Sequence, residues 1–493
     1  MNGMRILLGF VALLAGLSVS VGTIVAQQGP PKRLAPYIKE DSPVLVLEHV
    51  RIIDGTGAAP EQDMRIDIEG GKISRVQSAK LHNAYPINAK VIDLTGKTVI
   101  PGMVGMHEHL FYPTQGRPKD GQHMYGEMAD SAPRLYLAGG VTTARTAGSM
   151  EPYTDLALKQ KIDAGQTPGP KLDITGPYLG GMNGLAPQMH TLTGPEDAAR
   201  MVDYWAAEGV TSFKAYMDIT PEELKAAIDH AHAKGLKLTG HLCSVGFKEA
   251  AALGIDNLEH GLLMDTEFYP GKKPGICPEP NSVLEDMAKN LDVAGPQVQA
   301  MIRDLVAHHV AVTSTLAVHE TFAPNWPPMA RETRALKAMS PAANEQYLRW
   351  RSVFAEDPDG HGSSEAKLLQ KEMQFEREFV EAGGLLMAGC DPTGYGGVVP
   401  GFGDQRNVEL LVEAGFTPVE AIQIATQNGA KYLGEDATIG TITAGKSADL
   451  VVLSGNPAEK IEDIEKVETV FKDGVGFDPT KLIESVSELV GIR

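Results

Sequence analysis

Residues 99–109 have the sequence Val-Ile-Pro-Gly-Met-Val-Gly-Met-His-Glu-His, an apolar run that ends in two histidines one residue apart. Side chains alternate across a strand, so His107 and His109 face one side and Glu108 faces the other. Neutral imidazole is a common ligand of divalent cations. The segment therefore predicts a buried strand with two candidate metal ligands at its carboxyl end.

Beyond this segment, short apolar runs alternate with helical stretches, a pattern typical of βα units around a parallel sheet. Thr220 followed by Pro221, Glu222 and Glu223 predicts a helix over 221–234. The predicted strands are Val99–Met106, Val141–Thr146, Leu172–Thr175, Thr211–Ala215, Leu236–Thr239, Asp256–Leu258, Val310–Thr315 and Leu385–Ala388. Eight such units predict a (β/α)8 TIM barrel over residues 96–437.

Both chain ends carry a different pattern, short alternating runs separated by Gly and Asp turns. The N-terminal runs are Val44–Val50, Met64–Ile68, Ile73–Val76 and Val91–Leu94, and the C-terminal ones are Gly440–Ile442, Ala448–Leu453 and Val467–Val470. We predict that residues 27–95 and 438–493 form one small discontinuous β-domain. The whole chain is then of the α/β class.

The composition is that of a folded protein with a small-molecule partner. The 493 residues are 43% hydrophobic and 22% charged, which excludes disorder, collagen and coiled coil. The formal net charge of -19 argues against a nucleic-acid or anionic-membrane surface. A homo-oligomer is compatible with these numbers, and nothing in the sequence fixes the oligomeric state.

The first residues predict export. Arg5 precedes an apolar run over 6–25 that ends at Ala26, as in a secretory signal peptide of residues 1–26. We expect a periplasmic or secreted protein with no stable membrane anchor after cleavage. The three cysteines, Cys243, Cys277 and Cys390, predict no disulfide framework, and Cys243 and Cys390 are interpreted as small buried hydrophobes.

In a TIM barrel the reactive groups lie at the carboxyl ends of the strands. Suitable residues end five of the predicted strands: His107, His109, Lys214, His241, His260 and Asp391. Each has an ordinary structural explanation by itself, such as a satisfied polar histidine or a lysine extending to solvent. Together they predict a metal centre, because imidazole and carboxylate suit Zn²⁺, Mn²⁺ or Fe²⁺.

This set resembles the amidohydrolase superfamily of metal-dependent hydrolases, over nearly the whole chain after the signal peptide. Further marks are Gly140-Val-Thr-Thr143, Glu259-His-Gly261, Thr417-Pro-Val-Glu-Ala421 and Gly440-Thr-Ile-Thr-Ala-Gly-Lys-Ser-Ala-Asp-Leu450. The resemblance implies a distorted (β/α)8 barrel with a β-sandwich built from both chain ends. Lys214 and Glu259-His-Gly261 most resemble the branch of Xaa-Pro dipeptidases and imidazolonepropionase-like hydrolases.

By this resemblance the centre holds two divalent metal ions, Zn²⁺ first, with Mn²⁺, Fe²⁺ or Co²⁺ as alternatives. His107, His109 and Asp391 would bind one ion, His241 and His260 the second, and N6-carboxylated Lys214 would bridge them. A hydroxide between two cations is nucleophilic near neutral pH. Asp391 would take its proton and pass it to the leaving nitrogen.

Three further residues are candidate catalytic or substrate contacts: His190 after the third strand, Tyr216 two residues beyond Lys214, and His319 after the seventh strand. Each could equally be an ordinary loop or core residue. A substrate carboxylate would need a cation at the rim, for which Arg145, Lys248, Arg331 and Arg406 are the candidates.

The predicted activity is hydrolysis of an amide or peptide-like C–N bond in a small substrate, a dipeptide or N-acyl amino acid. Lactones, cyclic amides and organophosphates are the alternative substrates, and a non-catalytic exported metal-binding protein is the alternative of another class. Deamination is disfavoured because superfamily deaminases normally lack the bridging lysine. The long connections at about 265–308 and 318–384 are predicted to cover the site and set specificity.

Overall fold

The computed structural model describes residues 33–81, 83–113, 124–181, 186–356 and 362–492. The predicted signal peptide, residues 1–26, lies outside the described residues. Within the described ranges, none of the helices combines the length and apolarity needed to cross a membrane.

Eight parallel strands form the centre of the molecule, in two sheets. The first sheet has the order β11-β10-β7 and the second the order β12-β13-β14-β15-β16. Their bounds are β7 (Met103–Glu108), β10 (Val141–Thr146), β11 (Lys171–Asp173), β12 (Ser212–Met217), β13 (Lys237–Leu242), β14 (Asn257–Glu259), β15 (Ala311–Ser314) and β16 (Leu386–Ala388). All neighbouring pairs are parallel, as the alternation of strands and helices predicts.

Backbone contacts link the outer strands of the two sheets. Parallel bridges join Thr175 to Ser212 and Leu179 to Ala215, beside β11 and β12. At the other side, the backbone N–H of Asp391 donates to the carbonyl of His107 at 2.9 Å, so the segment after β16 lies beside β7. The carboxyl ends of both sheets therefore meet in one region, while the closed eight-stranded barrel stays a prediction.

The first predicted strand, Val99–Met106, is in fact two strands. Thr98–Pro101 is β6 and Met103–Glu108 is β7, and they belong to different sheets. The break falls at Gly102, where a Cβ atom would lie 2.1 Å from the Thr142 hydroxyl oxygen. This close approach requires glycine, and it lets the chain pass from the outer sheet into the central one.

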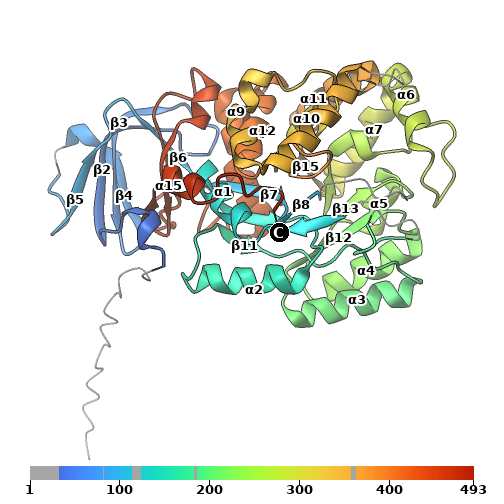
Figure 1. Cartoon of the computed structure of the whole chain (residues 1–493), viewed down its shortest axis with the longest axis horizontal. Coiled ribbons are helices and arrows are strands. Elements are labelled where there is room, and N and C mark those ends of the chain that lie inside the picture. The colour runs from blue at the N-terminus through green and yellow to red at the C-terminus, as the bar shows by residue number, and fades with distance from the viewer. Residues whose placement is uncertain (1–32, 82, 114–123, 182–185, 357–361, 493) are drawn as a thin grey trace, which may run out of the picture.

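Both chain ends contribute to one nine-stranded sheet (Figure 1, β2–β6 in blue). Its strands are β1 (Ile38–Glu40), β2 (Val44–Ile52), β3 (Glu61–Glu69), β4 (Lys72–Ser78), β5 (Lys90–Asp93), β6, β17 (Leu450–Leu453), β18 (Val467–Lys472) and β19 (Val475–Phe477). β6 pairs with β2 on one side and with β17 on the other. The predicted strand at Gly440–Ile442 is wrong, because these residues form a bend beside Asp54. The two-sheet sandwich stays a prediction.

Helices cover the central strands. They are α1 (Ser131–Gly139), α2 (Pro152–Asp163), α3 (Pro195–Glu208), α4 (Pro221–Ala233), α5 (Phe247–Leu253), α7 (Pro296–Ala307), α12 (Phe402–Glu413), α13 (Pro418–Gln423) and α14 (Gly429–Leu433). The predicted helix is confirmed as α4, in which Thr220 and Glu223 form a capping box and Leu224, Ala227 and Ile228 bury the apolar face. Such burial supplies most of the stability of a short amphipathic helix.

Helices from the two long connections form a layer of their own (Figure 1, yellow-green to orange). It consists of α6 (Pro280–Asn290), α8 (Leu316–Glu320), α9 (Met329–Ala338), α10 (Pro341–Glu356) and α11 (Gly362–Glu381). The predicted helix at Glu365–Glu381 is confirmed as most of α11. α11 packs on α6 and on the turn η3 (Gly261–Met264), which follows β14. Smaller elements are the hairpin of β8 (Phe111–Pro113) and β9 (Tyr125–Glu127), and α15 (Pro479–Glu484).

One cysteine prediction is wrong. Cys243 is not a free hydrophobe but forms a disulfide with Cys277, with their Cα atoms 5.0 Å apart. The connection after β14 folds back over the end of β13, a long-range contact that sequence spacing does not reveal. Lys272 fixes the same loop by donating to the carbonyls of Cys243 and Ser244. Cys390 is free and buried, as predicted.

Candidate metal centre and active site

A cavity of about 230 Å³ lies at the carboxyl ends of the parallel strands. It is lined by His107, His109, Phe111, Tyr125, Met150, Tyr178, Lys214, Tyr216, His241, His260, Met264, Val318, His319, Phe322, Asp391, Thr393, Gly394 and Tyr395. All six residues predicted as metal ligands are therefore in one place. They come from five separate strand ends, which is the arrangement that the sequence predicts.

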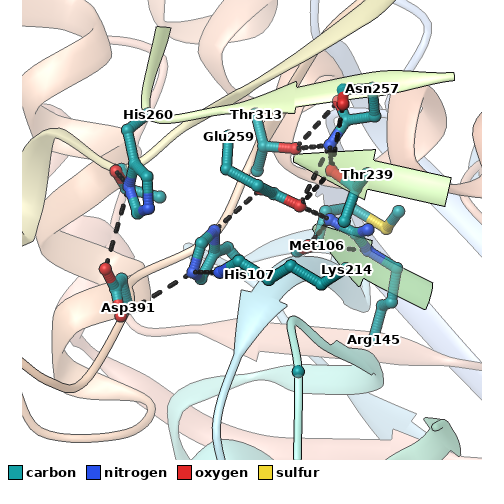
Figure 2. A network of polar contacts seen from close by, with 12 residues as sticks. Met106, His107, Arg145, Lys214, Thr239, Asn257, Glu259, His260, Thr313 and Asp391 are labelled. Atoms are coloured by element: carbon teal, nitrogen blue, oxygen red, sulfur yellow. Dashed lines mark hydrogen bonds and ion pairs between the residues drawn. The ribbon is translucent and has the colours of Figure 1, made fainter. Parts of the chain in front are cut away.

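The predicted ligand atoms lie close together. The Nε2 atom of His107 is 3.2 Å from Lys214 Nζ and 3.7 Å from Asp391 Oδ1. The other oxygen of Asp391 lies 3.8 Å from His260 Nδ1, and His109 Nε2 lies 3.2 Å from Oδ1. His107, His260 and Asp391 each offer a ligand atom within 4.8 Å of the others (Figure 2). A single small cation could contact all three.

The register of β12 and β13 brings the remaining ligand to the same face. Lys214 pairs with Thr239 and Tyr216 pairs with His241, two positions on. Because strand side chains have a period of two, Lys214, Tyr216 and His241 all point the same way. The His241 ring lies 4.5 Å from the His260 ring and 4.7 Å from the Tyr216 ring, measured between centroids.

Two of these residues adopt backbone conformations that L-amino acids rarely use. His260 has φ of 68° and Asp391 has φ of 49°. Such left-handed positions are sparsely populated outside glycine and persist where surrounding contacts hold them, often at functional sites. The conformation aims both side chains into the cavity immediately after β14 and β16.

Burial sets the charge state of the site. It lowers the pKa of all four imidazoles, that of His109 to about 4, so their nitrogen lone pairs are free near pH 7. It also lowers the pKa of Lys214 to about 8. Burial alone would raise the pKa of Asp391, but His107 and His109 outweigh it and keep that carboxylate ionised.

A buried polar network orients His107 from behind (Figure 2). Glu259 Oε2 lies 2.7 Å from His107 Nδ1, and Oε1 accepts hydrogen bonds from Arg145 at 2.7 Å and Thr239 at 2.6 Å. Burial alone would raise the pKa of Glu259, but the nearby Arg145 guanidinium holds that pKa well below its usual range. A carboxylate behind a histidine ligand fixes its tautomer and raises its basicity.

This donor set fits a divalent cation. Neutral imidazoles, one ionised carboxylate and a carboxylate-backed histidine are the groups that zinc-type centres use. His260 is oriented in a similar way, with its Nδ1 atom 2.7 Å from the Thr315 hydroxyl. Glu108 faces away from the cavity, as alternation predicts, and accepts from the Cys390 thiol at 3.0 Å.

Of the three candidate substrate contacts, two line the cavity and one does not. Tyr216 and His319 line the cavity, and His319 Nε2 is buried with no hydrogen-bond partner in the described protein. Burial lowers the pKa of His319 to about 4, so the ring is neutral. His190 is not brought to this cavity: its ring lies 2.8 Å from Asp197, and the side chain is 40% exposed.

The structure does not place the predicted cations at the cavity. Arg145 is buried behind His107 and paired with Glu259, and Lys248 faces Asp304 at the surface. Arg331 and Arg406 pair with Glu409 on α12. Each of these charges has an acidic partner, and none of the four side chains lines the cavity.

Sequence reasoning missed the residues that support the ligands, above all Arg145 and Glu259 as a buried pair. The available signal was two opposite charges inside strands whose other residues are apolar, since such charges are buried only when paired. It also missed the aromatic lining formed by Phe111 of β8, Tyr125 of β9 and Tyr178 after β11, because these short segments have no distinguishing pattern.

Residues 98–476 match the model of the amidohydrolase family. The chain belongs to this family. Among solved structures, this amidohydrolase resembles a putative prolidase from Bifidobacterium longum, with a TM-score of 0.63 and 25% identity over 90% of this chain and 98% of that one. It also resembles a Xaa-Pro dipeptidase with bound methionine in its active site, with a TM-score of 0.64 and 21% identity over 88% and 100% of the two chains.

Curated relatives match this amidohydrolase over short segments. Adenine deaminase 2 of Jannaschia sp. (strain CCS1) is 32% identical over 80 residues, 16% of this chain and 13% of that protein. Dihydroorotase of Elusimicrobium minutum (strain Pei191) is 36% identical over 99 residues, 19% of this chain and 20% of that protein. Membership of this family supports a hydrolase.

Proposed function

We propose that this amidohydrolase is a metal-dependent hydrolase that cleaves an amide or peptide-like C–N bond of a small substrate, a dipeptide or N-acyl amino acid. The observation that carries the proposal is the convergence of six candidate ligands from five strand ends on one cavity. The parallel strands behind it would form the distorted (β/α)8 barrel, supported by the bridges from the segment after β11 to β12 and by the contact of Asp391 with His107.

His107, His109 and Asp391 would hold one divalent ion, with Zn²⁺ as the expected metal, and His241 and His260 would hold a second. Carboxylated Lys214 would be a further ligand: Lys214 Nζ is buried 3.2 Å from His107 Nε2, and an ammonium cannot ligate a cation whereas its carbamate can. Bound divalent cations supply an electrophile for the carbonyl and lower the pKa of water.

Side chains of the protein would transfer the proton and orient the substrate. Asp391 is held ionised in the cavity, so it can accept a proton from the attacking water and return it to the leaving nitrogen. Tyr216 and the unpartnered His319 Nε2 are donors that can orient the carbonyl oxygen. Glu259 and Arg145 keep His107 in place.

We further propose that the protein acts outside the cytoplasm. The apolar run over residues 6–25 is one support. The disulfide between Cys243 and Cys277 is a second, because disulfides form and persist in oxidising compartments.

Metal content measured by plasma mass spectrometry tests the proposal, beside a screen of Xaa-Pro and other dipeptides, N-acyl amino acids, lactones, cyclic amides and organophosphates. We expect two equivalents per chain, turnover of an amide class, and loss of metal in Lys214→Ala. Lys248→Ala, on the surface, is the matched control and should keep both ions.

Three results would count against the proposal. One equivalent or none, with no turnover after zinc and bicarbonate are supplied, would remove the bridging role of Lys214 and the catalytic assignment. Two equivalents without hydrolysis of any substrate would favour a metal-binding protein. Turnover of lactones or organophosphates alone would move the activity to those bonds.

A further inference from the structure

A second cavity opens beside the catalytic one. It has a volume of about 550 Å³ and shares Met264, His319, Phe322 and Tyr395 with the catalytic cavity. Its size lies in the usual range of small-molecule sites, about 300–1,000 Å³. The proposed cleavage of the C–N bond does not require this second cavity, so its function needs an explanation of its own.

The walls of this second cavity come mainly from the helical layer of the two long connections. α6 contributes Val283, Leu284 and Met287, α10 contributes Trp350, Val353 and Phe354, and α11 contributes Leu368; Met217 and Leu242 from β12 and β13 form the base. These side chains are apolar, and most of them come from the helical layer rather than from the central strands.

Aromatic rings stand where the two cavities join. The Tyr395 ring lies 4.8 Å from Phe354, 4.9 Å from Trp350 and 5.2 Å from Phe322, between centroids. Phe322 in turn lies 6.2 Å from His319, inside the catalytic cavity. Packed aromatic side chains give a large apolar contact area with little conformational freedom to lose. A group reaching past His319 would therefore meet an ordered apolar wall.

The charge of the second cavity disfavours an anion. Its described lining contains no lysine or arginine, and it does contain the carboxyl group of Glu365. Burial raises the pKa of Glu365 to about 7. A substrate carboxylate in this cavity would lose its water beside another acid and gain no cation from the described lining.

We propose that the second cavity binds an uncharged apolar group, alkyl or aryl, on the same substrate whose C–N bond lies against the ligand cluster. This inference rests on the proposed function and narrows it to substrates with a large apolar group beside the scissile bond. The continuity of the cavities through Met264, His319, Phe322 and Tyr395 is what ties the occupant to the substrate.

Two matched substrate series test this inference in the zinc-loaded protein. N-acetyl-, N-hexanoyl- and N-decanoyl-glycine enlarge the acyl side, and N-acetyl-glycine, -leucine and -tryptophan enlarge the other side. Burial of one methylene is worth up to roughly fourfold in affinity. We expect kcat/KM to rise at least tenfold along one series, and N-(9-carboxynonanoyl)glycine, with a terminal carboxylate, to lose that gain.

Substitutions in the wall of the second cavity test whether this cavity causes the preference for large apolar substrates. Leu284→Trp fills the cavity from α6 and should reduce the ratio of kcat/KM for the large over the small substrate at least fivefold. Leu348→Trp on α10 is the matched control, because Leu348 is 38% exposed and does not line the cavity. If Leu284→Trp does not fold, Val353→Trp, at a position 39% exposed on the rim, replaces it.

Binding of octan-1-ol, which has no hydrolysable bond, separates this inference from the proposed function. A saturable change in Trp350 fluorescence that is absent in Trp350→Phe supports an apolar site. Turnover that is equal along both series overturns the inference and leaves the proposed function standing. No turnover of any amide or peptide overturns the proposed function and the substrate role of the cavity, whatever octan-1-ol does.

Discussion

At the scale of single residues, two histidines that the sequence offers equally as substrate contacts lie in opposite environments. His319 points an unpartnered nitrogen into the cavity, whereas His190 pairs with Asp197 at the surface. A hydrogen bond to developing charge is worth about 1.5–3 kcal/mol. We expect His319→Asn to lower kcat/KM about tenfold to a hundredfold with metal content unchanged, and His190→Ala to change it less than about twofold. Equal losses in steady-state kinetics would contradict this.

Arg145 is a structural counter-ion rather than a substrate anchor. It donates to Glu259 and to the Met106 carbonyl from a fully buried position. Removing one partner of a buried ion pair costs about 3–5 kcal/mol, because the other charge stays buried. Arg145→Met should therefore lower the free energy of unfolding by that amount in urea titrations. Arg349→Met, with a side chain 74% exposed, should change it by less than about 0.5 kcal/mol.

The candidate ligands could be predicted from sequence because each ends a strand, and strand ends meet in a parallel α/β fold. The buried residues that hold these ligands in place could not be predicted in the same way. Which buried charges pair depends on the order of strands β7, β10 and β14 in space, and the sequence does not give that order at the resolution of one side chain. The same reason explains why Arg145 is a plausible substrate cation in sequence and a partner of Glu259 in the structure.

At the scale of elements, α11 packs against β16 and η3 and carries two buried acids, Glu372 and Glu376. Burial raises the pKa of Glu376 to about 8. The neutral acid is favoured in the folded state, so its contribution to stability is complete below about pH 4.5 and is lost as pH rises through about 8. Glu376→Gln does not titrate. Its melting temperature relative to wild type should therefore rise between pH 5 and pH 9.

Differential scanning calorimetry at several pH values measures this difference. Glu381→Gln, at the exposed end of the same helix, is the matched control and should show an offset that does not depend on pH. A pH-independent difference for Glu376→Gln as well would show that Glu376 is not neutral in the folded protein.

The disulfide joins the end of β13 to the loop before α6, closing a segment of 34 residues. Constraining a loop of that length stabilises the folded state by roughly 3–4 kcal/mol. We expect Cys277→Ser to lose about that much in thermal unfolding. Dithiothreitol should lower the melting temperature of wild type and have no further effect on the variant. An equal effect of reductant on both would mean that it acts elsewhere.

The strand positions of the central sheets were predictable because apolar runs bounded by polar helices are distinctive. The division of one predicted strand into β6 and β7 at Gly102 was not predictable, since an unbroken apolar run gives no sign of a turn. The prediction of a strand at Gly440–Ile442 was wrong because this segment does not pair with another strand. Its single apolar side chain packs beneath β2 and β3 without joining a ladder, and pairing partners are not visible in a short segment.

At the scale of the whole molecule, the C-terminal residues are part of the core. Leu482, Val486 and Val490 are 0% exposed, beside α1 and the end of α9. Burying each such side chain is worth about 1.5–3 kcal/mol, and a typical folded protein has a net stability of about 5–15 kcal/mol. Truncation after Asp478 should therefore leave the protein insoluble on expression. Removal of Ile492 and Arg493 should leave its yield and melting temperature unchanged.

The place of β6 between β2 and β17 has a consequence for the order in which the protein can fold. Pro101 pairs with Leu450, so roughly 350 residues must be synthesised before one edge of β6 finds its partner. Until then an apolar strand edge is open to pairing with other chains. The N-terminal strands therefore complete their sheet late, after the central strands, and only a chain carried through to its last strands can close it. Conditions that prevent completion, such as stalled synthesis or a nick near residue 450, should yield aggregates rather than a shorter active enzyme.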